Sequence, residues 1–444
     1  MSSNTTQSLP QLQQDKTQAG NYFVANYPPF SFWSADGRYH VDEALQQRPI
    51  DDTVLGLYVH IPFCRKRCHF CYFKVYTDRN AQQIRDYMKA VVDELRMFID
   101  RPLIAGRVPR FVYFGGGTPS YLSAEQLTYL TDQLKAALPW DQAQEIAFEC
   151  EPGTLTEKKL RAIRDFGVTR LSLGIEHFDE QILQANNRAH LSAEIYRAYE
   201  TAREIGFPQI NIDLIAGMLG ETDEKWYDAV SQAITLQPDS ITIYQMEIPF
   251  NTTVYQWMKE QGLDGAPVAD WQTKRRWVAD AFARLEREGY TIGSAYTAVR
   301  DPGIAFLYRD ELWRGADMLG IGVSSFSHLH GVHYQNEHHI DPYIEQVQRG
   351  EMPIRRAMCI NDEEAMIRQF VLQMKLGRVE TAPFKQRFGV DLTHRFSDRL
   401  REYRDKGWLN FDDVAIELSR DGLLQVDSLL HGFFLPRHRD SEST

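Results

Sequence analysis

The sequence predicts an α/β protein built on one parallel sheet, followed by a smaller helical region. Between residues 54 and 248, six short apolar strands alternate with amphipathic helices. This alternation is typical of a doubly wound sheet or of a full or partial barrel, and the pattern alone does not choose between them. In each of these folds the functional residues gather at the carboxyl ends of the strands, so a site is expected there.

The predicted elements follow one another in regular order. The strands cover residues 54–61, 110–114, 145–150, 170–178, 209–217 and 240–248, and the helices cover residues 80–99, 155–167, 192–206 and 223–236, with one more helix that opens at residue 123. Ser123 and Gln126 form a capping-box pattern at that opening. Farther on, residues 274–290 predict a helix and residues 317–331 a buried strand with a turn. Residues 360–434 are helical in pattern, which predicts a separate small domain.

Two segments precede the α/β region. Residues 1–20 carry too little apolar surface to offset the entropy of ordering, and we predict a disordered tail. Residues 21–50 open with the aromatic stretch "NYFVANYPPFSFW". We expect an arm that packs on the main domain, with an arm that folds over an active site as the alternative. The predicted organisation is a tail (1–20), an arm (21–50), an α/β unit (51–350) and a small helical domain (360–440).

Composition narrows the class of protein. The formal net charge of −12 argues against a nucleic-acid partner or an anionic membrane surface. No apolar run is long enough for a membrane span, and the first twenty residues lack the apolar core of a signal peptide. Five cysteines, an odd number, do not form a disulfide framework of the secreted type. We therefore expect a cytoplasmic protein whose clustered thiols serve metal or redox chemistry.

Three of these cysteines follow the first strand within eight residues, in "HIPFCRKRCHFCYF". Cys64, Cys68 and Cys71 have the spacing C-x3-C-x2-C, whereas a structural zinc site usually combines two C-x2-C pairs. Cys150 and Cys359 stand alone, and we interpret each as a small buried apolar residue. Three thiolates on one loop can hold three irons of a [4Fe–4S] cluster and leave the fourth iron open. We favour this interpretation, with zinc as the alternative.

The same residues carry a family resemblance. The spacing C-x3-C-x2-C after a first strand resembles the radical S-adenosylmethionine (SAM) enzymes, and "LYVHIPFCRKRCHFCYF" resembles the oxygen-independent coproporphyrinogen III oxidase group among them. The resemblance runs from Tyr58 to the C-terminus. It implies a partial (β/α)6 barrel with an N-terminal arm and a small helical, winged-helix-like C-terminal lid domain. The acidic chain argues against DNA binding by that domain.

The resemblance also implies cofactors and partners. The open iron would bind the amino and carboxylate groups of SAM. One-electron reduction would then cleave SAM to methionine and a 5′-deoxyadenosyl radical, which abstracts a hydrogen atom from the substrate. The implied partners are a small-molecule substrate, such as a tetrapyrrole, and an electron donor such as flavodoxin or ferredoxin.

Several site residues follow from the same motifs. In "GGGTPS" the glycines allow close backbone approach and the exposed N–H groups can hold a ligand. Carboxylates in apolar strands need a partner, either a structural ion pair or a ligand. The resemblance implies a set of residues that contact SAM, namely Tyr58, Gly116, Gly117, Thr118, Glu149, Glu176, Arg188 and Asp213. It places Phe326 at a second SAM molecule.

Five histidines cluster late in the barrel region, at positions 328, 330, 333, 338 and 339. Their spacing fits no standard pair of metal ligands, and we interpret them as loop or substrate-pocket residues, with haem ligation as the alternative.

Three positions depart from the decarboxylase pattern. Phe73 stands where the family has a fourth cysteine two residues past the third. Glu176 replaces a glutamine that contacts SAM, and its added charge would need a proton or a partner. Tyr308 aligns with the glutamine that helps to hold the second SAM.

Three functional hypotheses result. The first is a radical SAM enzyme that abstracts hydrogen from a porphyrinogen or another conjugated hydrophobic substrate. The second is a methyltransferase that uses two SAM molecules, one as the radical source and one as the methyl donor. The third is a haem chaperone that carries a cluster without turnover.

Overall fold

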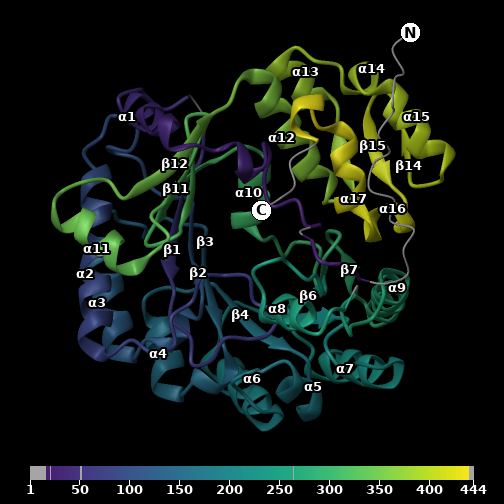
Figure 1. The fold of residues 1–444 in the computed structure, drawn as a ribbon, viewed down its shortest axis with the longest axis horizontal. Coiled ribbons are helices and arrows are strands. Elements are labelled where there is room, and N and C mark those ends of the chain that lie inside the picture. Colours follow the sequence, from purple (N-terminus) through teal and green to yellow (C-terminus); the bar gives the residue numbers. More distant parts are fainter. Residues whose placement is uncertain (1–16, 21, 51–52, 264, 440–444) are drawn as a thin grey trace.

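The computed structural model describes residues 17–20, 22–50, 53–263 and 265–439. Its main feature is a sheet of twelve strands in the order β12-β11-β10-β9-β1-β2-β3-β4-β5-β6-β8-β7 (Figure 1). The six central strands are β1 (Leu55–Ile61), β2 (Phe111–Gly116), β3 (Glu145–Cys150), β4 (Arg170–Glu176), β5 (Gln209–Ala216) and β6 (Ser240–Gln245). They run parallel and pair in sequence order, which confirms the predicted parallel α/β core.

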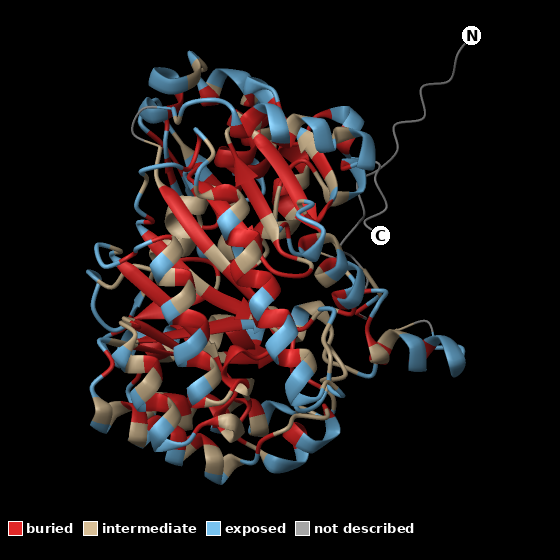
Figure 2. Cartoon of the chain, turned by 90° about the vertical axis from the view of Figure 1, so that its left-hand side faces the viewer, coloured by how far each residue is buried: buried red, intermediate tan, exposed pale blue. Residues whose placement is uncertain are grey.

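Helices cover the outside of this parallel core. The main ones are α2 (Ala81–Phe98), α3 (Ala124–Ala137), α4 (Glu157–Asp165), α6 (Ser192–Ile205), α7 (Asp223–Leu236) and α9 (Trp271–Arg287). Figure 2 shows the buried strands behind helices whose outer faces are exposed. Ser123 and Gln126 form the predicted capping box of α3, and Asn80 and Gln83 form another at α2. Both helices therefore begin just beyond the carboxyl edge of the sheet.

Further strands widen the sheet on both sides without closing it. Strand β9 (Asp317–Ile321) adds parallel to β1, and it is followed by the antiparallel strands β10 (Phe326–Leu329), β11 (Val332–Asn336) and β12 (Ile354–Cys359). On the other side, β8 (Thr297–Val299) and β7 (Thr291–Ile292) add antiparallel to β6. Because β12 and β7 remain edges, the molecule has a partial barrel, as the resemblance implied.

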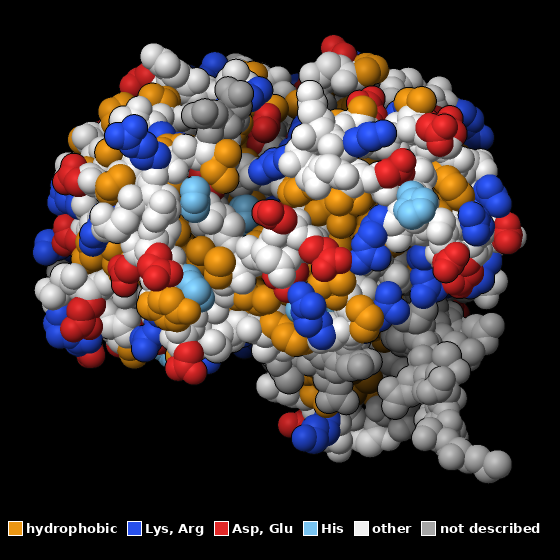
Figure 3. All heavy atoms as spheres, turned by 90° about the horizontal axis from the view of Figure 1, so that it is seen from above, with side chains coloured by type: hydrophobic (Ala, Val, Ile, Leu, Met, Phe, Trp, Pro, Cys, Tyr) orange, Lys and Arg blue, Asp and Glu red, His pale blue; other side chains and the backbone are white. Residues whose placement is uncertain are grey.

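Shorter helices complete the barrel region and its connections. They are α1 (Tyr39–Leu45), α5 (Glu180–Ala185), α8 (Thr253–Glu260), α10 (Leu307–Trp313) and α11 (Ile340–Gln348). Among the described residues, no helix combines the length and the apolar character that crossing a membrane requires. On the face seen in Figure 3, side chains of both charge signs are interspersed among the described residues. This face therefore lacks the extended basic surface that a nucleic acid would need.

The C-terminal domain has its own apolar core, with Phe370, Leu400 and Phe433 at its centre. Its helices are α12 (Asp362–Met374), α13 (Ala382–Phe388), α14 (Leu392–Arg395), α15 (Ser397–Asp405), α16 (Arg420–Leu424) and α17 (Val426–Leu430). It also contains an antiparallel sheet in the order β13-β15-β14, formed by Arg378–Glu380, Ala415–Leu418 and Leu409–Phe411. Sequence analysis predicted only helices here, because strands of three or four residues are too short to show a period of two.

The N-terminal arm starts beside the C-terminal domain and ends at α1, which packs on β11 and β12 of the barrel (Figure 1). The Lys375 ammonium donates to Val24 O at 2.7 Å, and the Lys274 ammonium donates to Thr17 Oγ1 at 2.8 Å. Residues 1–16 of the predicted tail lie outside the described residues. Thr17, which the prediction placed in that tail, is instead buried against the barrel. Two buried lysines therefore hold the N-terminal segment, Lys274 of the barrel at Thr17 and Lys375 of the C-terminal domain at Val24.

Candidate metal and cofactor site

The three clustered cysteines lie on the loop that follows β1. Backbone hydrogen bonds from Cys64 N to Tyr76 O (3.1 Å) and from Tyr76 N to Pro62 O (2.8 Å) close the base of this loop. All three cysteines are free thiols, and Cys64 is buried. The loop therefore holds three sulfurs at the carboxyl edge of the sheet, where the fold class predicts a site.

The sulfurs need a cation to become thiolates. Burial raises the pKa of Cys64 to about 12, and the neighbouring sulfurs of Cys71 and Cys68 add to the effect. The pKa of Cys71 rises to about 11, again through burial first and then through Cys68. Thr118 Oγ1 donates to Cys64 Sγ at 3.3 Å, which partly opposes the rise. Metal ligation requires thiolates, so bound iron would supply the charge that the site lacks.

The spread of the sulfurs favours a cluster over a single ion. Thiolates around one tetrahedral zinc lie about 3.8 Å apart, as follows from Zn–S bonds of about 2.3 Å. Among the described residues, the cysteine sulfurs do not form a group of three with all donor atoms within 4.8 Å. Cys150 lies inside β3 and Cys359 is exposed at the end of β12, so neither belongs to the loop. The three sulfurs are therefore too far apart for one zinc ion in this arrangement, which agrees with a larger group such as an iron–sulfur cluster.

The glycine turn after β2 packs against the cysteine loop. A Cβ on Gly117 would lie 3.0 Å from Cys64 Sγ, and Gly116 has φ +117°. The N–H groups of Gly116, Gly117 and Thr118 already donate to Glu149 Oε2, Ile61 O and Phe63 O. The sequence-based argument that these N–H groups are free for a ligand is therefore wrong. The glycines instead allow the backbone to approach the sulfur closely.

Accessible side chains point inward from otherwise buried strands. Strand β1 is buried except at Tyr58, and β3 is buried except at Glu149. The corresponding residues of the other strands are Tyr113 on β2, Glu176 on β4, Asp213 on β5 and Tyr244 on β6. Tyr58 pairs in register with Tyr113, and their rings stack at 5.8 Å. Tyrosines and carboxylates therefore line the inner face of these strands, and we call the space that this face borders the chamber.

The carboxyl groups of this chamber have raised pKa values. Burial raises the pKa of Glu149 to about 7, and Asp213 adds to the rise although Tyr113 donates a hydrogen bond to Glu149. Burial also raises the pKa of Asp213, against hydrogen bonds from Ser172 Oγ and Asn211 Nδ2, both at 2.9 Å. A cationic ligand would reverse these shifts, because an opposite charge stabilises the ionised form.

Arg188 joins the cysteine loop to this chamber. Its guanidinium donates to Cys68 Sγ at 3.2 Å and to Gly174 O at 2.6 Å, and it lies 3.4 Å from Glu176 Oε1. Burial opposes its charge, but Cys68 and Glu176 outweigh burial and raise the pKa of Arg188 above its ordinary value. Glu176 therefore has the charged partner that its departure from the family pattern required. The Nε of Arg188 is buried without a hydrogen-bond partner and remains available to a ligand.

His60 is a residue that sequence analysis missed. It lies two positions after Tyr58 on β1, and its Nδ1 is 3.1 Å from the Tyr58 hydroxyl. A Cβ on Gly116 would lie 2.6 Å from the His60 ring, and Nε2 is buried without a partner. Burial lowers the pKa of His60 to about 4, so the ring is neutral. The period of two from Tyr58 was the signal that could have placed it on the same face.

Arg65, the residue after Cys64, anchors the cysteine loop through a second set of contacts. Arg65 forms two hydrogen bonds with the Glu151 carboxylate, both at 3.0 Å, and a third with Ala189 O at 2.9 Å. His190 Nδ1 lies 3.1 Å from Glu151 Oε1. Burial opposes ionisation of Glu151, but His190 and Arg65 outweigh it and lower the pKa of the carboxyl to about 2. The loop is thus attached to the ends of β3 and α5.

Replacing Arg65 by alanine should therefore loosen the cysteine loop. Outer partners of metal ligands typically change metal affinity by 10–100-fold, so we expect cluster loss to a chelator to become about tenfold faster. The measurement is the decay of visible absorbance after chelator is added to the anaerobically reconstituted protein. Lys66→Ala is the matched control, since Lys66 is the next residue, is exposed and forms no ion pair among the described residues. Equal decay in both variants would contradict the assignment.

The remaining predicted residues lie elsewhere around the chamber. Tyr308 stacks on Tyr113, with ring centroids 4.2 Å apart, and therefore joins the stack of Tyr58 and Tyr113. Phe326, predicted to contact a second SAM, packs against Phe30 (4.6 Å) and Trp33 (5.8 Å) of the arm. The structure therefore joins Phe326 to the arm, and its contact with a second SAM stays a prediction.

The five histidines do not form one group. His328 and His333 face each other on β10 and β11, with ring centroids 4.5 Å apart, so they are strand residues rather than loop residues. Burial, followed by the charge of Arg368, lowers the pKa of His328 to about 3. His338 and His339 lie at the start of α11, where Glu337 is their neighbour.

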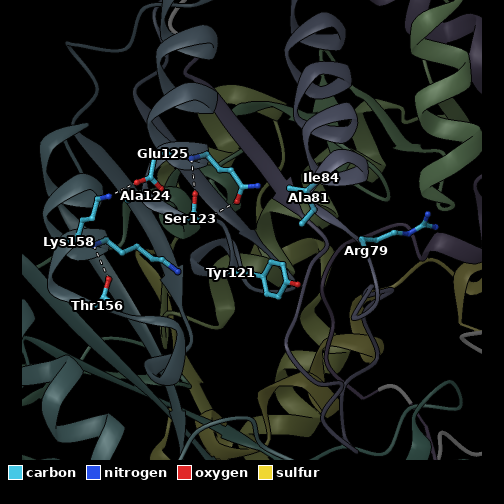
Figure 4. A pocket seen from close by; sticks show the side chains of 11 residues that line it. Arg79, Ala81, Ile84, Tyr121, Ser123, Ala124, Glu125, Thr156 and Lys158 are labelled. Carbon is cyan, nitrogen blue, oxygen red and sulfur yellow. Dashed lines mark hydrogen bonds and ion pairs between the residues drawn. The ribbon is translucent and has the colours of Figure 1, made fainter.

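A cavity of about 530 Å³ lies outside the barrel, where α2, α3 and α4 begin (Figure 4). Its basic side chains have partners. Lys158 pairs with Glu125, and the Lys159 ammonium donates to Ser120 O and Thr154 O. None of the three clustered cysteines lines it, so this cavity is separate from the cysteine loop.

Comparison with known proteins agrees with this geometry. The family model "Radical SAM superfamily" matches residues 58–233, and the model "HemN C-terminal domain" matches residues 360–424. The first match begins within β1 and covers the cysteine loop, the glycine turn and strands β2–β5. The second covers α12 and most of the small C-terminal domain.

Curated relatives extend over most of the chain. The heme chaperone HemW of Bacillus subtilis is 26% identical over 382 residues, which cover 85% of this chain and 98% of the relative. The oxygen-independent coproporphyrinogen III oxidase of Escherichia coli is 27% identical over 417 residues, or 90% of this chain and 86% of the relative. The solved structure of coproporphyrinogen III oxidase (HemN) from Escherichia coli matches with a TM-score of 0.81 at 24% identity, covering 94% of this chain and 99% of that one.

Proposed function

We infer that this chain, which belongs to the radical SAM superfamily and carries a HemN C-terminal domain, is an enzyme that abstracts hydrogen from a tetrapyrrole. Radical SAM proteins use a [4Fe–4S] cluster and SAM. The observation that carries the proposal is the loop of Cys64, Cys68 and Cys71, which offers three thiols and has Phe73 at the position of a fourth. When bound, the cluster would supply the electron for the reductive cleavage of SAM. This cleavage makes hydrogen abstraction from the substrate possible.

The chain's own residues hold and orient the ligand in this proposal. Arg188 Nε and His60 Nε2 are buried polar atoms without hydrogen-bond partners. The first can donate to the carboxylate of an amino-acid group. Glu149 can hold its ammonium, and this contact would lower the pKa of Glu149, which burial raises in the free protein. Gly116 and Gly117 let the turn pack directly against His60 and Cys64, which holds both residues beside the proposed ligand.

A flat conjugated substrate fits the aromatic lining of the chamber. Tyr58, Tyr113 and Tyr308 stack in one group, and Tyr244 is 42% exposed on the opposite strand of the barrel. Aromatic side chains bury large apolar faces in offset stacks, which suits a tetrapyrrole ring. The relatives' names, coproporphyrinogen III oxidase and heme chaperone, both concern tetrapyrroles.

Two other functions are compatible with the same residues. A haem chaperone is supported by the HemW relative, which is matched over 98% of its length. A methyltransferase with two SAM molecules is the other alternative, because the resemblance places Phe326 at a second SAM molecule, whereas Tyr308 departs from the decarboxylase pattern at that same molecule. Each alternative predicts different products.

The test is an anaerobic reconstitution followed by addition of SAM, a strong reductant and one tetrapyrrole at a time, with products identified by mass. We expect 5′-deoxyadenosine only when reductant is present. Loss of carboxyl groups from the tetrapyrrole would indicate decarboxylation, and a gained methyl group with S-adenosylhomocysteine would indicate methyl transfer. Stoichiometric haem retention without 5′-deoxyadenosine for any tetrapyrrole would contradict an enzymatic role.

A further inference from the structure

Three metal-binding side chains lie together at the junction between β11 and α11. Glu337 Oε1 lies 2.9 Å from His338 Nδ1 and 3.6 Å from His339 Nδ1. All three donor atoms lie within 4.8 Å of one another, and no other three His, Cys, Asp or Glu side chains of the described chain meet this condition. The group contains none of the cysteines and none of the inward-facing residues of the barrel.

The donor separations match those around a single metal ion. Imidazole and carboxylate ligands bind zinc at about 2.0–2.1 Å, so ligand atoms in a tetrahedral site lie about 3.3–3.4 Å apart. The separations of 2.9 Å and 3.6 Å lie on either side of that value. Two imidazoles and one carboxylate are also the usual protein ligands of ferrous iron in non-haem oxygenases. The side chains thus need only small movements to enclose an ion.

A buried polar atom points to a missing ligand. Nδ1 of His338 is buried and makes no hydrogen bond, although Glu337 Oε1 is 2.9 Å away. That oxygen instead accepts the backbone N–H groups of His338 (2.7 Å) and His339 (3.0 Å). The ring nitrogen and the carboxylate oxygen lie at ion-pair distance, and a cation beside them could bind both at once.

The charges around the group oppose each other. Arg355 acts on both His338 and Glu337, and its charge opposes a cation. The carboxylate of Glu337, which accepts the N–H groups of His338 and His339, offsets that charge.

The surroundings connect this group to the cysteine loop. Ile340 N donates to the Tyr76 hydroxyl at 2.9 Å, and Asp341 forms two hydrogen bonds with Arg79 at 3.0 Å and 2.9 Å. Tyr76 is also the residue that closes the base of the cysteine loop. A metal ion at the start of α11 would therefore fix the segment that leaves this loop.

We propose that Glu337, His338 and His339 bind one divalent transition-metal ion, zinc or ferrous iron, in a mononuclear site separate from the cysteine loop. Water completes the coordination, since the side chains of His338 and His339 are 32% and 50% exposed. The site stands on its own geometry and does not depend on the tetrapyrrole chemistry proposed above.

The first test is a zinc titration of the reconstituted, cluster-loaded chain against a chromophoric chelator. We expect one zinc ion per chain, bound roughly tenfold or more weakly in His338→Ala and in His339→Ala. His40→Ala is the matched control, because His40 Nδ1 lies 3.2 Å from Glu43 Oε2 in a surface pair without a third donor. Glu337→Gln keeps the shape of the side chain and should also weaken binding. Equal zinc affinity in the wild type and the His338→Ala/His339→Ala double variant would overturn the proposal.

X-ray absorption at the zinc edge separates this site from the thiols. Nitrogen and oxygen ligands at about 2.0–2.1 Å support the proposal, and sulfur at about 2.3 Å overturns it. For iron, the cluster accounts for four ions per chain, so we expect a fifth ferrous ion that His339→Ala loses while His40→Ala retains it. Because His339 is half-exposed, its replacement should leave the melting temperature unchanged, which a circular-dichroism melt checks. Absence of both the additional zinc and the fifth iron would also overturn the site.

Discussion

Replacing Cys68 by alanine should abolish the iron–sulfur cluster and, with it, all cleavage of SAM. The sulfur is one of three on a single loop, and the fifth residue past it is Phe73 rather than another cysteine, so the loop has no spare thiol. Loss of this sulfur also leaves the buried guanidinium of Arg188 without a contact at 3.2 Å. We expect visible absorbance to vanish after anaerobic reconstitution and 5′-deoxyadenosine formation to fall by about 100-fold or more.

Two other cysteines provide the controls for this experiment. Cys359 is exposed at the end of β12, and Cys150 lies inside β3. Cys359→Ala should retain full iron and full SAM cleavage. Cys150→Ala should retain the cluster as well, with a modest loss of stability from the buried position. Full iron retention in the Cys68→Ala protein would remove the cysteine loop as the cluster site.

Much of the barrel was predictable because its signals are local. Each central strand is apolar and ends at a turn, and each following helix is amphipathic and long enough to show its period. The capping box at Ser123 fixed the start of α3 to the residue. The cysteine spacing was equally local, since three ligands within eight residues need no long-range contact to be recognised.

The parts that were missed depend on contacts between distant segments. Lys274 and Lys375 read as ordinary helix residues, yet both are fully buried under the arm, where they bind Thr17 and Val24. The N–H groups of the glycine turn looked free in sequence, but Glu149, from the next strand, accepts one of them. Strand pairing and burial decide such cases, and neither can be read from a stretch of residues.

The charged partner of Glu176 is another contact that could not be predicted from the sequence. Sequence analysis recognised that Glu176 would need a proton or a partner, but it could not identify the partner. The structure supplies Arg188, which approaches from the segment after α5 and also contacts a cysteine of the loop. One guanidinium therefore compensates a carboxylate and a sulfur at once, and this shared role makes its loss costly.

Arg188→Ala should be the most damaging change outside the cysteines. The side chains of Arg188 and Glu176 are 10% and 13% exposed, and removing one partner of a buried ion pair typically costs about 3–5 kcal/mol. Burial first, and then Asp213, raises the pKa of Glu176 to about 7 even with Arg188 opposing the rise. Without Arg188, the pKa of Glu176 should rise further.

The sign of the pH effect follows from this shift. A carboxyl whose pKa is higher in the folded state stabilises the fold at low pH and loses that contribution as pH rises through the folded pKa. The free energy of unfolding of Arg188→Ala should therefore fall more, relative to wild type, at pH 8 than at pH 6. Urea unfolding of the chain at the two pH values measures this difference.

A double variant separates the two partners of Arg188. Arg188→Ala/Glu176→Gln removes the uncompensated carboxylate, so it should recover most of the stability at pH 8 and lose the pH dependence. Cluster retention should stay low in both variants, because the contact with Cys68 is gone in each. If the double variant is as unstable at pH 8 as Arg188→Ala, then Glu176 is not the group that Arg188 compensates, and the electrostatic account of this departure from the family pattern fails.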